Sequence, residues 1–191
     1  MPNQNRRVAE LLKGLQAARA DFLAAIADVD PALRTTPGLA GEWSARELLA
    51  HVGFWAGHAS EAIHRAEEGE LADFGAGEIT VDERNVIVAR VATETDYPTV
   101  AAREASAFEA FAELLARADP EWLGEHDASG DSLEEIIGYD GADHYREHTL
   151  DIRSWFDGSN DEDEDADDGD DDDETDADEG ANPANAEPAR E

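Results

Sequence analysis

SLEEIIGYDGADHYREHTLDIRSWF, residues 132–156, is the stretch that decides the fold. Ser132 and Glu135 have the spacing of a capping box, in which the serine oxygen accepts the third helical amide and the glutamate reaches back to the cap. The stretch therefore predicts a helix over about residues 133–156. Its apolar residues recur at helical spacing, so one face of this helix is expected to be buried.

Two histidines lie on that buried face. With 100° per residue, His144 and His148 fall within about 20° of Ile137. The pair is one helical turn apart, close enough to hold a single ion. Buried imidazoles without partners are costly, so their place on the core face favours a shared ligand. Structural packing of both histidines remains the alternative.

Three further long helices and one short helix are expected upstream. Capping-box spacings occur at Ser44 with Glu47 and at Thr80 with Glu83. No stretch alternates with a period of two for long enough to predict a strand. The fold class is therefore all-α: a four-helix bundle over residues 1–156 with a long crossover between its second and third helices. The expected upstream helices are residues 4–29, 44–68, 80–92 and 98–118.

The last 35 residues have a different composition. Residues 157–191 contain 18 acidic residues, one basic residue and almost no apolar ones. Such a segment cannot bury enough apolar surface to offset the entropy of ordering. A disordered acidic C-terminal tail is therefore expected over residues 157–191, either keeping the protein in solution or recruiting a basic partner.

The charge balance is strongly acidic. The 191 residues include 48 acidic and 14 basic ones, for a formal net charge of −34. Phosphate backbones and anionic lipids should be repelled at long range, so nucleic acid and membranes are excluded here as partners. Lys13 is the single lysine. Adaptation to high salt would explain an acidic balance with so little lysine, a GC-rich genome would also favour Arg over Lys, and both stay open.

Cysteine and targeting signals give two further expectations. The chain has no cysteine, so any thiol chemistry needs a thiol supplied from outside. The pair Arg6 and Arg7 is followed by charged residues where a signal peptide would be apolar. No run is long and apolar enough for a membrane span. A cytoplasmic location is expected.

A third histidine completes a candidate metal site. His51 lies at the edge of the apolar stripe of the second helix, beside Val52 and Trp55, so it can face the interior. The metal ligands predicted are His51, His144 and His148, and no catalytic residue is assigned. A satisfied core histidine is the alternative for His51. The remaining histidines are interpreted as surface residues: His58, His64 and His126.

Other side chains are expected to support this site. Asp140 and Asp151 lie within one turn of the two last histidines, so either could accept a ring N–H, with a solvated carboxylate as the alternative. The four tryptophans are interpreted as core or pocket wall: Trp43, Trp55, Trp122 and Trp155. The sequence has no glycine-rich phosphate loop, no HExxH motif and no nucleophile elbow.

Five short motifs together resemble the DinB-like superfamily. They are GEWS at 41–44, LLAHV at 48–52, VDERN at 81–85, HYREH at 144–148 and DIRSW at 151–155. The resemblance extends over about residues 5–156 and leaves out the acidic tail. It implies a DinB-type four-helix bundle with a three-histidine site for nickel, zinc or a similar ion. The implied ligands are His51, His144 and His148.

The resemblance also suggests a class of reaction. Some superfamily members are thiol-dependent, including mycothiol-dependent maleylpyruvate isomerase and bacillithiol S-transferase. Three neutral imidazoles leave coordination positions open, as in catalytic metal sites. We therefore expect a divalent-metal-dependent enzyme that activates a low-molecular-weight thiol, or a water, against a small-molecule substrate. The alternative is a non-catalytic metal-binding or small-molecule-binding bundle, and a homodimer stays open.

Overall fold

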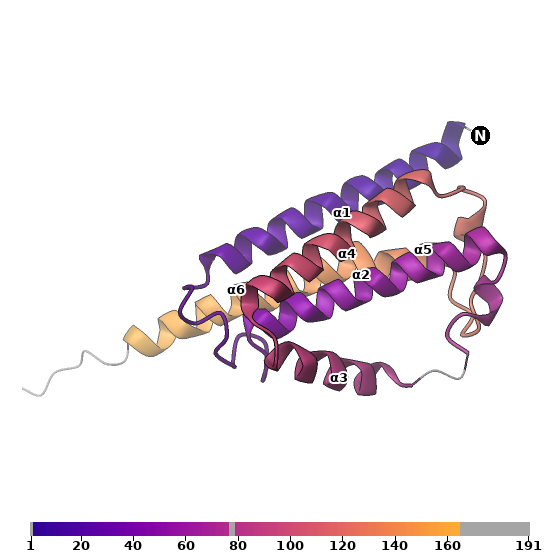
Figure 1. Cartoon of the computed structure of the whole chain (residues 1–191). Coiled ribbons are helices and arrows are strands. Elements are labelled where there is room, and N and C mark those ends of the chain that lie inside the picture. Colours follow the sequence, from indigo (N-terminus) through magenta and orange to yellow (C-terminus); the bar gives the residue numbers. More distant parts are fainter. Residues whose placement is uncertain (1, 77–78, 165–191) are drawn as a thin grey trace, which may run out of the picture.

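The computed structural model describes residues 2–76 and 79–164, and every regular element in these ranges is a helix (Figure 1). The all-α bundle predicted from the sequence is confirmed. The four long helices are α1 (Pro2–Asp28), α2 (Ala45–Glu68), α4 (Tyr97–Arg117) and α6 (Asp143–Glu164). The shorter elements are α3 (Val81–Thr93), α5 (Leu133–Ile137), the 3₁₀ turns Leu71–Asp73 and Trp122–Gly124, and the π-helical turn Gly138–Ala142.

The four long helices pack in a closed ring. Helix α2 packs along α4, α4 contacts α1, and α1 packs along α6. Helix α2 also contacts α5 and the π-helical turn, which lead into α6, and these contacts close the ring. Helix α3 belongs to the crossover between α2 and α4 and packs on α2 (Figure 1). In the described ranges, no helix is both long enough and apolar enough to cross a bilayer.

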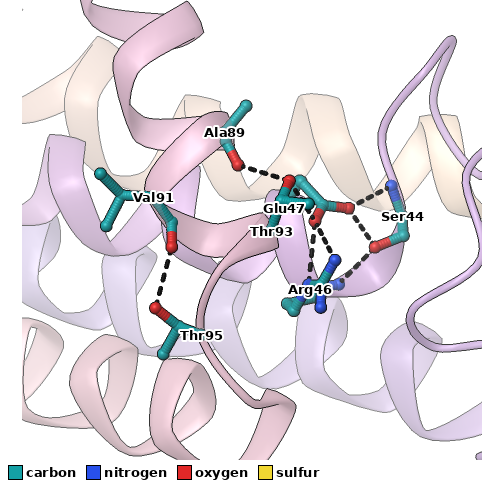
Figure 2. Close-up of polar contacts among 7 residues, drawn as sticks. All are labelled: Ser44, Arg46, Glu47, Ala89, Val91, Thr93 and Thr95. Atoms are coloured by element: carbon teal, nitrogen blue, oxygen red, sulfur yellow. Dashed lines mark hydrogen bonds and ion pairs between the residues drawn. The ribbon is translucent and has the colours of Figure 1, made fainter.

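All three predicted capping boxes are present, at Ser44, Thr80 and Ser132. The first also joins two helices, as Figure 2 shows. Glu47 accepts hydrogen bonds from the Ser44 amide and hydroxyl, forms an ion pair with Arg46 at 2.9 Å, and accepts from the Thr93 hydroxyl of α3 at 3.4 Å. Burial alone would raise the pKa of Glu47, but these hydrogen bonds and the Arg46 guanidinium hold it below its usual value.

A buried carboxylate links three helices in the centre of the bundle. Glu104 of α4 is 2% exposed, and it accepts two hydrogen bonds of 2.8 Å from Arg19 of α1. The Tyr145 hydroxyl of α6 donates a third, at 2.7 Å. Helix α2 approaches the same point, because a Cβ atom on Gly53 would lie 3.0 Å from the Glu104 Cα. Such a fully bonded buried charge fixes how the helices are rotated against one another.

The π-helical turn was not predicted, and it changes which face of the last helix is buried. An uninterrupted helix over residues 133–156 would centre the buried face on His144 and His148. The backbone of this turn is non-helical at Gly141 (φ −110°, ψ −106°), so the helix is kinked there and the residues after it are rotated relative to α5. Tyr145 and Ile152 are fully buried against the other helices, and the two histidines are half-buried on the flank that faces α2. Gly141 is in this turn, where a Cβ atom would lie 3.0 Å from the Phe111 ring.

Helix α6 continues to Glu164, beyond its predicted end at Phe156. The apolar pattern of the sequence stops at Phe156, and such a pattern indicates only which residues can be buried. The backbone hydrogen bonds of the helix continue, since they do not depend on an apolar face. The predicted acidic tail lies, from residue 165 onward, outside the described residues.

We predict that Glu104→Ala lowers the free energy of unfolding by about 3–5 kcal/mol, because Arg19 and Tyr145 lose their partner in the core. Tyr145→Phe removes one hydrogen bond and should cost about 1–2 kcal/mol. The matched control is Glu109→Ala, an exposed carboxylate on the same helix, expected within about 0.5 kcal/mol of wild type. Urea denaturation measures all three; equal midpoints for Glu104→Ala and Glu109→Ala would contradict the central role of Glu104.

Candidate metal centre

The bundle brings His51 of α2 together with His144 and His148 of α6. One nitrogen atom of each ring lies within 4.8 Å of one nitrogen of each of the others. The Nε2 atoms of His51 and His144 are 2.6 Å apart. Ring centroids lie 4.6 Å apart for His51 and His144, and 5.0 Å apart for His148 and either of the others. The predicted constellation of three imidazoles is therefore present as a geometric cluster.

The second nitrogen of each ring has a different environment. His148 Nδ1 pairs with Asp151 Oδ2 at 2.8 Å, as predicted, which leaves Nε2 free. The backbone of Tyr139 hydrogen-bonds to His144. His51 Nδ1 is buried with no hydrogen-bond partner among the described residues. His51 is instead held by packing, since the Trp43 ring lies 4.6 Å and the Trp55 ring 6.4 Å from it, centroid to centroid.

Burial keeps two of the rings neutral. It lowers the pKa of His51 from 6.5 to about 2, with further lowering from charge repulsion by His144 and His148. Burial and His148 lower the pKa of His144 to about 4, although its hydrogen bond with the Tyr139 backbone opposes the change. Both rings are therefore in the neutral form that ligates metals at neutral pH.

The histidines line a cavity of about 430 Å³. Trp43 and Trp55 form aromatic walls, as the sequence predicted for these two tryptophans. The crossover helix α3 closes another side with Val81 and Asn85, and the Asn85 side chain accepts a hydrogen bond of 3.2 Å from Trp55 Nε1. The remaining lining residues are Tyr139, Asp140 and Glu147.

His58 was predicted to be a surface residue, and this prediction is wrong. His58 is 17% exposed at its side chain, and its Nδ1 lies 2.7 Å from Asp140 Oδ2. Asp140 was expected to orient His144 or His148; its hydrogen bond goes to His58. A signal was available, because His51 and His58 are seven residues apart and share a helix face. Their axial separation of about 10 Å argues against a shared ion, but not against a carboxylate partner. His64 and His126 are exposed, as predicted.

The donor set fits a divalent ion. Metal–imidazole bonds of about 2.0–2.1 Å place neighbouring ligand atoms roughly 3 Å apart, within the spread of these three nitrogens. His148 has the carboxylate partner that metal-ligating histidines usually have, and His51 departs from that pattern. Three imidazoles and no described carboxylate in the cluster leave coordination positions facing the cavity. Nitrogen donors of this kind suit zinc and nickel better than magnesium or calcium.

Fold and site together define an all-helical bundle with a three-histidine group beside an aromatic-walled cavity. No family model and no curated protein matches the chain. Two solved structures share the fold. An uncharacterised protein from Escherichia coli UTI89 aligns with a TM-score of 0.67 and 16% identity, over 80% of this chain and 94% of its own. The colibactin self-resistance protein ClbS, solved in complex with a dsDNA, aligns with a TM-score of 0.64 and 15% identity, over 78% and 94%.

The ClbS complex corrects one prediction. The exclusion of nucleic acid as a partner rested on net charge alone, and a protein of the same fold is found with dsDNA bound. Net charge is an inadequate criterion because individual local contacts to phosphate and base, and not the total charge of a chain, hold nucleic acid. That exclusion is therefore withdrawn.

We predict that the chelator-treated protein loses stability as the pH falls below about 6.5. Unfolded histidines titrate near 6.5, whereas folded His51 and His144 stay neutral down to about 2 and 4. Protons therefore bind the unfolded chain preferentially between pH 6.5 and 4. The free energy of unfolding should fall by about 1.4 kcal/mol for each histidine per unit of falling pH.

Urea denaturation at several pH values measures this dependence. The many carboxylates titrate in every variant, so the informative quantity is a difference in slope. In His51→Gln, the slope of the free energy of unfolding against pH should be smaller than in wild type by about 1.4 kcal/mol per pH unit. In His64→Gln, at an exposed position, the slope should equal that of wild type. Parallel curves for wild type and His51→Gln would contradict a buried neutral ring.

Proposed function

We propose that this protein is a divalent-metal-dependent enzyme of the DinB-like type, with His51, His144 and His148 holding nickel or zinc. Its reaction is the activation of a low-molecular-weight thiol, or a water, for attack on a small electrophile. The observation that carries the proposal is the convergence of three imidazoles on one side of a cavity. A closed structural site would surround the ion with a fourth protein ligand.

A bound ion would supply Lewis acidity, which lowers the pKa of a thiol or water at its open positions. The chain itself provides the rest. His51 anchors the group in the core, and Asp151 holds His148 with Nε2 toward the cluster. Trp43 and Trp55 cover the imidazoles with apolar surface and keep bulk water from them. The chain has no cysteine, so the thiol comes from a separate molecule.

The cavity supports a small-molecule substrate. A volume of about 430 Å³ is within the range of small-ligand pockets. Its polar groups are few: apart from the histidines, they belong to Asn85, Tyr139, Asp140 and Glu147. A ligand would thus be held by aromatic contact and oriented by a small number of hydrogen bonds, as is usual for such sites.

A non-catalytic metal-binding role is the competing function from the same site, and chelation separates the two. A structural metal stabilises the fold, so its removal lowers the melting temperature strongly. A catalytic ion in a preformed bundle leaves most of the stability to the core. Large destabilisation by chelator, combined with no turnover of thiol and electrophile by the loaded protein, would favour the structural role.

Elemental analysis tests the metal site directly. We expect about one zinc or nickel ion per purified chain, and a loss of most of it in His144→Ala, because two remaining imidazoles bind far more weakly than three. His64→Ala is the control, as His64 is exposed on the same helix as His51. Equal metal content in all three proteins would place the ion elsewhere.

Binding of double-stranded DNA is a second candidate, favoured by the likeness to ClbS in complex with a dsDNA. On this candidate, the protein raises the anisotropy of a fluorescently labelled duplex at low salt, and the affinity falls linearly with salt on logarithmic axes. A single-stranded oligonucleotide of the same length is the control. Unchanged anisotropy at high protein concentration removes the candidate without affecting the metal site.

A further inference from the structure

Asp140 and His58 form a buried acid–base pair next to the three-histidine group. Asp140, in the π-helical turn, is 2% exposed, and its Oδ2 lies 2.7 Å from His58 Nδ1 on α2. No ligand role is available to the pair in the three-histidine cluster. A carboxylate and an imidazole in hydrogen-bond contact, buried at a cavity, are the components of general acid–base chemistry.

The two partners lie at different distances from the cavity. Asp140 lines the histidine cavity, and His58 does not. The His58 ring is packed behind Asp140 between the rings of Trp55 and Phe74, with centroids 5.1 and 4.7 Å away. Asp140 is thus the member that a molecule in the cavity can reach, and His58 is the positioning residue that holds one of its oxygens.

We propose that Asp140, positioned by His58, accepts the proton of the thiol that enters this cavity. The S–H bond breaks, its electron pair stays on sulfur, and the proton forms an O–H bond on the Asp140 carboxylate. This inference rests on the proposed function, because it needs a thiol bound at the histidine group.

Other acceptors around the cavity are less suited. The three imidazoles of the cluster would have their free nitrogens engaged as ligands. Glu147 is exposed at the rim of the cavity, where water competes with a bound thiol for its carboxylate. The pKa of the Tyr139 phenol is raised by burial and by neighbouring carboxylates, so the phenol is protonated and cannot accept.

The surroundings of Asp140 suit the role. Burial raises the pKa of Asp140, which makes it a better proton acceptor than an exposed carboxylate, and His58 and Arg84 limit the increase. The groups that face it are His58 from α2, Arg84 from α3 and the adjacent Tyr139. His58 and Arg84 both favour the ionised form of this carboxylate, which is the form that can take up the proton.

The experiment tests whether a proton is released to solvent when a thiol binds, and it does not require turnover. Full-length protein is loaded with cobalt(II), and 2-mercaptoethanol is titrated in. The cobalt absorption spectrum gives the Kd for the thiol at pH values from about 6 to 8, below the pKa of a free thiol. If Asp140 keeps the proton, none is released, and the wild-type Kd changes less than about twofold per pH unit. In Asp140→Asn the proton goes to solvent, so the Kd falls about tenfold for each unit of rising pH.

Glu109→Gln is the control, an exposed carboxylate on α4 outside the cavity that is expected to behave like wild type. If Asp140→Asn fails to load cobalt, His58→Phe replaces it: without the imidazole the Asp140 oxygen loses the partner that positions it, so a pH-dependent Kd is expected. The same dependence in wild type and Asp140→Asn, or pH-independent binding in His58→Phe, overturns the role of Asp140. Absence of any thiol binding to loaded wild type overturns the proposed function and this inference with it.

Discussion

The hydrogen bonds to the buried Glu104 carboxylate are the constraint on which the site depends. Arg19 of α1 and Tyr145 of α6 both bond to Glu104 of α4, and Gly53 lets α2 approach the same point. Tyr145 directly follows His144, so a rotation of α6 that moved His144 away from α2 would also break the hydrogen bond of Tyr145 to Glu104. The hydrogen bonds at the bundle centre therefore set the direction of His144 and His148 toward α2.

His51 reaches the cluster by a different route. Its Nδ1 has no hydrogen-bond partner, so only packing against Trp43 and Trp55 determines its orientation. Trp43 is in turn positioned just before the cap of α2, where Ser44, Glu47 and Thr93 join α2 to the end of α3. The crossover thus has two functions in the structure: α3 closes the cavity, and its last turn stabilises the helix start that places the tryptophan.

The sequence was informative where local rules act. The capping boxes at Ser44, Thr80 and Ser132 each begin a helix, because a cap depends on residues within one turn. The three histidines were found by helical spacing, since helices that bury a common face bring such positions together. The π-helical turn was missed because its cause is tertiary: Gly141 lies against Leu15 and Phe111, which are distant in sequence. The pairing of His58 with Asp140 was missed because the same turn directs Asp140 to His58 and away from His144 and His148. Net charge failed as a guide to nucleic acid because it carries no information on local contacts.

The π-helical turn, which the helical pattern did not predict, also explains how one short segment contributes to two parts of the site. These parts are the three-histidine group and the Asp140–His58 pair. In a regular helix, Asp140 and His144 would lie one turn apart on a single face and would point to the same place. The kinked backbone separates their directions: His144 meets His51 with Nε2 atoms 2.6 Å apart, and Asp140 bonds to His58, seven residues further along α2. A single helix thereby presents two imidazoles in a cluster and one carboxylate at a second position along the same cavity. π-Helical turns within α-helices occur frequently at functional sites, and the carboxylate displaced by this one is the group for which a proton-accepting role is proposed.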